Sequence, residues 1–84
     1  MNHRETVEMI AAIINRVLTD KGDAAQAIGA DTIILGSDLA FDSLDLAAMV
    51  VEMDGVTGTT PFAGGFINFH TVGELAALYV ATRN

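Results

Sequence analysis

The sequence predicts an all-α fold with three main helices and one short helix. Three segments repeat apolar residues at helical spacing, and a residue able to cap a helix precedes each of them. No stretch alternates apolar and polar residues as a half-buried strand does, and the short apolar run from Ile33 to Leu35 has no partner of similar quality. With 84 residues the chain can bury a single core, so we expect one domain over residues 1–84.

The first helix is predicted from His3 to Asp20. Asn2 and Glu5 have the spacing of a capping box, and Gly22 provides the stop. Its apolar face is expected to contain Val7, Ile10, Ile13, Ile14, Val17 and Leu18. A long first loop follows, up to Phe41, and we expect its apolar residues to attach it to the core: Ile28, Ile33, Ile34, Leu35, Leu39 and Phe41.

The second helix is predicted from Ser43 to about Asp54, with Gly55 ending it. Asp42 is the expected N-cap, and Asp45 then occupies the third helical position, where negative charge is favoured. The residues expected to face inward are Leu44, Ala47, Val50 and Met53.

The last part of the chain is predicted to be a loop followed by a helix. Residues 56–69 are rich in glycine and threonine, with a short helix expected near Phe66–Phe69. We expect Phe62, Phe66 and Phe69 to cover the core, and the alternative is that they line a cleft. Thr71 and Glu74 then form a capping box for a helix that reaches about Thr82. Its inner stripe is predicted to be Val72, Leu75, Ala76, Leu78 and Tyr79.

Composition excludes several classes of function. Eleven acidic residues against four basic ones give a net charge of −7, which disfavours nucleic-acid binding and favours a partner with a basic surface, unless the acidity serves solubility alone. There is no cysteine, so disulfides and thiolate metal sites are excluded, and His3 and His70 lack metal-ligand spacing. Without a membrane-length apolar run or a signal-peptide pattern, we expect a cytoplasmic protein that binds no membrane.

Ser43 is the best candidate for a reactive group. A helix start carries roughly half a positive charge, so a phosphodiester on Ser43 would be stabilised there, although the flanking aspartates partly offset this effect. Hydrolytic catalysis is not expected, because Ser43 lacks the Gly-x-Ser-x-Gly context of a nucleophile elbow. The alternative is that the serine belongs only to the helix cap.

The segment Asp38-Leu39-Ala40-Phe41-Asp42-Ser43-Leu44-Asp45-Leu46 resembles the attachment segment of the acyl carrier proteins. The resemblance extends to the order of helices over nearly the whole chain, and it implies a small four-helix bundle with the long first loop crossing its top. It also implies that a separate phosphopantetheinyl transferase attaches 4'-phosphopantetheine from coenzyme A to Ser43. The thiol of that arm would hold acyl groups as thioesters, and the protein itself would not be an enzyme. Asp42 and Leu44 would then assist at the attachment site, and Leu44, Asp45, Val51 and Glu52 would dock partners.

The middle of the second helix departs from the family, because Ala47 to Val51 is almost wholly apolar. Some of Leu46, Ala48, Met49 and Val51 are expected to face outward, so the enzymes that load and process the acyl group would have basic or apolar docking surfaces. We expect a discrete monomer serving fatty-acid, polyketide or related biosynthesis. An aminoacyl (peptidyl-type) carrier and an unmodified helical interaction module are the alternatives.

Overall fold

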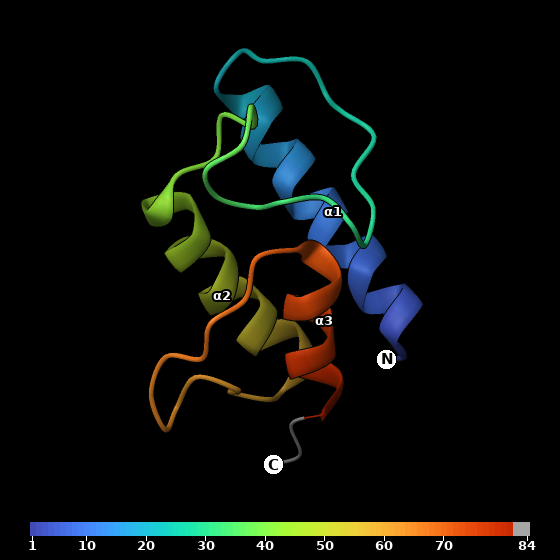
Figure 1. Ribbon diagram of the computed structural model, residues 1–84, viewed down its shortest axis with the longest axis vertical. Coiled ribbons are helices and arrows are strands. Elements are labelled where there is room, and N and C mark those ends of the chain that lie inside the picture. The colour runs from blue at the N-terminus through green and yellow to red at the C-terminus, as the bar shows by residue number, and fades with distance from the viewer. Residues whose placement is uncertain (82–84) are drawn as a thin grey trace.

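The computed structural model of the protein describes residues 1–81 and, within them, three helices: α1 (His3–Asp20), α2 (Ser43–Thr57) and α3 (Val72–Ala81). In Figure 1, α2 and α3 lie beside α1, and the long loop after α1 passes over the top of the molecule before it reaches α2. The β pairing found in this part of the chain is one isolated bridge between Ile33 and Thr71. The predicted all-α class is confirmed for the described residues.

Helix α1 has the predicted bounds. The Asn2 side chain accepts a hydrogen bond from the Glu5 amide at 2.8 Å, and the Asn2 amide donates to the Glu5 carboxylate at 3.0 Å. Gly22 follows the helix with a φ of 89°, a left-handed conformation that suits glycine. The buried side chains on the predicted apolar face are Ile10, Ile13, Ile14 and Leu18.

Helix α2 is longer than predicted. It continues past Gly55 to Thr57, and Gly58 is its C-cap. Gly58 has a φ of 71°, and its amide donates a hydrogen bond to the Asp54 carbonyl at 3.0 Å. Gly55 does not stop the helix because its own backbone is not left-handed. The prediction that Gly55 ends the helix is therefore wrong, and Gly58 ends it instead.

The predicted inner face of α2 is right for Met53 but wrong for Leu44 and Ala47. The buried residues are Leu46, Met49 and Met53, whereas Leu44 and Ala47 are exposed and Val50 is half-buried. Two ion pairs accompany this orientation, because Arg16 of α1 binds Glu52, and Lys21, which directly follows α1, binds Asp45. The stripe that then faces the core also carries larger side chains, which bury more apolar area.

The long first loop is bound to the beginning of α3. The amide of Ile34 donates to the His70 carbonyl at 3.0 Å, that of Val72 to Thr32 at 2.9 Å, and that of Gly73 to Ala30 at 2.8 Å. Ile34 and Phe41 are buried as predicted, whereas Ile33 and Leu35 are exposed. The loop thus brings Ile34 and Phe41 into the core and packs Ile28 and Leu39 against it, and it leaves Ile33 and Leu35 on the surface.

Residues 58–71 connect α2 to α3 without the short helix predicted near Phe66–Phe69. Two turns lie just before that position, closed by hydrogen bonds from the Ala63 amide to the Thr60 carbonyl and from the Gly65 amide to the Phe62 carbonyl, each 3.1 Å. Gly65 has a φ of 129°, which a helical residue does not adopt, so the turns that end at Gly65 do not continue as a helix.

Helix α3 begins at the predicted capping box. The Thr71 hydroxyl accepts from the Glu74 amide at 3.1 Å, and the Thr71 amide donates to the Glu74 carboxylate at 2.9 Å. Four of the five predicted inner residues are buried, namely Val72, Leu75, Ala76 and Tyr79, and Leu78 is half-buried. The predicted end at Thr82 lies outside the described residues. Within residues 1–81, no helix combines the length and apolar character needed to cross a bilayer.

Candidate functional site

Ser43 is the first residue of α2, and its side chain is exposed. Its hydroxyl makes no hydrogen bond to any other residue in the described part of the chain. The N-cap residue Asp42 has extended backbone, so the chain turns sharply into the helix at this point. The Ser43 oxygen is therefore accessible to a reagent from outside the molecule.

The cap of α2 is formed by the two flanking aspartates. The Asp42 carboxylate accepts from the Asp45 amide at 2.9 Å, and the Asp45 carboxylate accepts from the Asp42 amide at 3.0 Å. This reciprocal pair is a capping box, and it confirms Asp42 as the predicted N-cap. Because both bonds avoid the Ser43 side chain, the cap does not account for the Ser43 hydroxyl.

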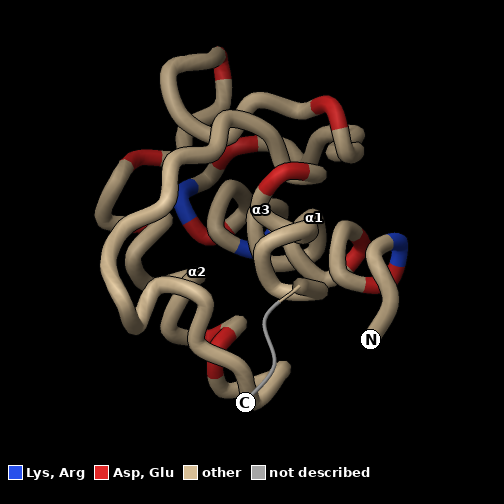
Figure 2. The backbone as a smooth tube through the Cα atoms, turned by 60° about the horizontal axis from the view of Figure 1, so that its bottom comes forward, with Lys and Arg blue, Asp and Glu red and all other residues tan. Residues whose placement is uncertain are grey.

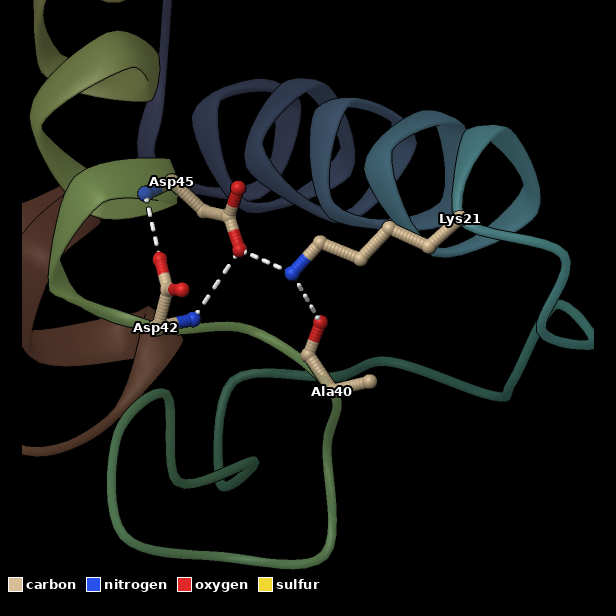
Figure 3. Close-up of polar contacts among 4 residues, drawn as sticks. All are labelled: Lys21, Ala40, Asp42 and Asp45. Atoms are coloured by element: carbon tan, nitrogen blue, oxygen red, sulfur yellow. Dashed lines mark hydrogen bonds and ion pairs between the residues drawn. The ribbon is translucent and has the colours of Figure 1, made fainter.

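Lys21 connects the end of α1 to this cap (Figure 3). Its ammonium group donates to the Ala40 carbonyl at 2.8 Å and also binds the Asp45 carboxylate. The pKa of Asp45 lies below its ordinary value, chiefly because of the hydrogen bond from Lys21 and then because of the Asp42 amide. The same contact raises the pKa of Lys21. The residues before and after Ser43 are thus held to α1 by one cation.

An apolar pocket of about 430 Å³ opens beside Ser43. It lies between the first loop, α2 and the segment that connects α2 to α3. Its lining residues are Leu35, Ser43, Leu46, Ala47, Val50, Phe62, Phe66 and Phe69. Ser43 is the one polar side chain among these, so its hydroxyl marks the boundary between an apolar hollow and solvent.

Three phenylalanines form one wall of the pocket. The ring centres of Phe62 and Phe66 are 5.7 Å apart and stacked, and Phe69 lies 5.9 Å from each of them. Phe62 and Phe69 are half-buried against the core, as expected for a cover, but Phe66 is 70% exposed. The expectation that all three cover the core is therefore wrong for Phe66, and the alternative of a cleft describes the arrangement better.

The predicted docking residues fall into two groups, exposed apolar residues and acidic residues that form ion pairs. Leu44 and Val51 are 79% and 73% exposed. Asp45 binds Lys21, and Glu52 accepts hydrogen bonds from both terminal nitrogens of Arg16, which lowers the pKa of Glu52. Sequence reasoning missed these two ion pairs, because their partners are separated by 24 and 36 positions.

The sequence also gave no direct sign that the pocket would include Leu35, Leu46 and Val50. In residues 1–81, no three side chains among the histidines and acids gather in a way that could hold a metal ion. Comparisons of this chain with protein-family models, curated proteins and solved structures find no match. Its function is therefore inferred from Ser43, the cap around it and the apolar pocket.

Proposed function

We propose that this protein is an acyl carrier that holds acyl groups as thioesters on a 4'-phosphopantetheine arm attached to Ser43. The observation that supports this most is the position of the Ser43 hydroxyl. It is exposed at the first residue of a helix, it is not required by the cap, and it borders an apolar pocket.

The surroundings of Ser43 fit a phosphodiester. The unpaired amides at the start of α2 favour negative charge, and Lys21 balances the carboxylate of Asp45. The attachment makes one bond from the Ser43 oxygen to the phosphorus that carries pantetheine. The bond to adenosine 3',5'-bisphosphate breaks with its electron pair, and a base of the transferase takes the hydroxyl proton. In this reaction Asp42 and Leu44 orient Ser43 from either side.

The pocket favours an acyl group over an aminoacyl group. Its lining contains no charged side chain, so an ammonium group placed there would lose its hydration without gaining a partner. The volume and the phenylalanine wall suit an apolar chain or ring. Fatty-acid and polyketide synthesis are the pathways that this chemistry serves.

The remaining features of the proposal concern the whole molecule. The protein acts as a monomer in the cytoplasm, and it serves a phosphopantetheinyl transferase and the enzymes that load and process the acyl group. Its helices pack as the small bundle of the acyl carrier family, with residues 58–71 in the place of the short helix. Leu44, Asp45, Val51 and Glu52 form the region that meets these enzymes.

Modification by a transferase tests the proposal directly. The protein is incubated with coenzyme A and a broad-specificity phosphopantetheinyl transferase, and intact mass is measured for wild type, Ser43→Ala and Ser37→Ala. Ser37 is the matched control because it is the other serine of the chain, and its hydroxyl donates to the Ile33 carbonyl at 3.0 Å.

We expect wild type and Ser37→Ala to gain one phosphopantetheinyl group and Ser43→Ala to gain none. An acyl group loaded on the modified protein should then be released by hydroxylamine, as thioesters are. If wild type gains no mass, or if Ser43→Ala gains as much, the protein is not this kind of carrier and the unmodified interaction module becomes the better explanation.

A further inference from the structure

Every acidic side chain of α2 is engaged within the molecule. Asp45 binds Lys21, which directly follows α1, and Glu52 binds Arg16 of α1. Asp54 accepts a hydrogen bond from the Tyr79 hydroxyl at 2.8 Å. The helix that follows Ser43 therefore offers a partner no acidic side chain that lacks a contact within the chain.

The face of α2 that lies opposite its buried residues carries an uncharged surface, which we call the α2 stripe and define as Leu44, Ala48, Val51 and Gly55. These four residues are exposed, and they lie at spacings of four, three and four, so they follow one face of the helix. The stripe extends for about 16 Å at 1.5 Å per residue. Ala48 and Gly55 are small, which allows close approach of a partner backbone along its length.

The α2 stripe begins at the residue next to Ser43. An enzyme that brings its reacting groups to the Ser43 oxygen must also cover Leu44 and the following turn of the same face. We infer that the phosphopantetheinyl transferase receives the α2 stripe in an apolar groove and does not hold α2 through a basic patch. This inference rests on the proposed modification of Ser43, and it assigns the docking role to Leu44 and Val51 among the four expected residues.

The charges of the molecule argue against two other partners for α2, namely a basic patch on the transferase and a second copy of this chain. A basic patch would have to compete with Lys21 and Arg16 for carboxylates that each already bind a cation, and these partly exposed pairs offer little net negative charge to attract it. A second copy of this chain would bring another net charge of −7 to the contact, and Figure 2 shows acidic positions spread over the molecule with few basic ones. An uncharged groove meets neither difficulty.

The test introduces first a negative and then a positive side chain at Val51, in the middle of the α2 stripe. The kcat/KM of modification is measured by intact mass for wild type, Val51→Asp and Val51→Lys, at low and high NaCl. If the groove is apolar, both variants should react about ten-fold more slowly, and the wild-type rate should change little with salt. Val56→Asp is the matched control, because Val56 is 49% exposed on the same helix but lies off the stripe, and it should react like wild type.

Other outcomes would overturn the inference. A faster Val51→Asp with a slower Val51→Lys, and a wild-type rate that falls steeply with salt, would indicate a basic patch. A wild-type dimer in solution that Val51→Asp converts to monomer would indicate a second copy as the occupant. Equal rates for wild type and both Val51 variants would refute docking through the α2 stripe and leave the proposed function standing. Failure of wild type to be modified would refute the proposed function as well. Circular dichroism confirms that each variant is folded.

Discussion

Replacing Gly73 by alanine is expected to loosen the long first loop. Gly73 lies in the first turn of α3, where its amide donates to the Ala30 carbonyl at 2.8 Å. A Cβ added at this position would be 2.9 Å from the Ala30 oxygen and 3.1 Å from the Ala30 Cβ. The loop backbone would then have to move away, although the backbone conformation of Gly73 itself suits alanine.

The magnitude follows from three terms. Crowding a packed contact costs about 1–3 kcal/mol, and weakening the bond between Gly73 and Ala30 costs up to about 1 kcal/mol. The helix gains at most about 1 kcal/mol from replacing glycine by alanine. The net result is a destabilisation of about 2 kcal/mol for Gly73→Ala.

Gly55→Ala provides the matched control. Gly55 lies within α2, and a Cβ there would have no neighbour within 4 Å, so only the helix term remains. We expect Gly55→Ala to stabilise the protein by about 0.5–1 kcal/mol. The same substitution in two helices should therefore change stability with opposite signs.

Urea denaturation followed by far-UV circular dichroism measures both variants against wild type. Thermal unfolding should shift in the same directions, by about 4–8 °C per kcal/mol for a domain of this size. The reasoning would be refuted if Gly73→Ala were as stable as wild type while Gly55→Ala behaved as expected. In that case the loop yields to the added methyl group, and the contact with Ala30 contributes little.

Two further predictions concern polar contacts. Tyr79→Phe removes the hydroxyl that donates to Asp54 and to the Val50 carbonyl, so stability should fall by about 1–2 kcal/mol in urea denaturation; an unchanged midpoint would contradict this. Burial raises the pKa of the Tyr79 hydroxyl, so the contribution of this hydroxyl to stability is complete below the ordinary pKa near 10 and is lost as the pH rises above that value. The free energy of unfolding measured at successive alkaline pH values tests this. The pKa of Asp45 is lowered, so its effect on stability has the opposite pH dependence. The contribution of Asp45 to the free energy of unfolding is complete above the ordinary pKa of 3.8 and is lost as the pH falls below that value. Lys21→Met should weaken this acid dependence in urea midpoints at successive pH values, and an equally steep loss would contradict the role of Lys21.

The helix starts could be predicted because their signals are local. Each capping box joins residues three positions apart, so Asn2, Asp42 and Thr71 mark their helices without knowledge of the rest of the fold. The end of α2 was less predictable, since Gly55 and Gly58 are both possible stops and only the backbone conformation distinguishes them. The helix predicted near Phe66–Phe69 is absent, and no capping box marks its start in the sequence.

The sequence by itself determined the helical class, the three cap positions and the place of Ser43 at the beginning of α2, because each depends on residues within one or two turns of each other. Only the tertiary structure decided which face of α2 is buried, which acids are paired and where the pocket lies. Those features depend on contacts such as Arg16 with Glu52, whose partners are 36 positions apart. Local spacing offers α2 more than one apolar face, and packing against α1 selects the one that lies inside.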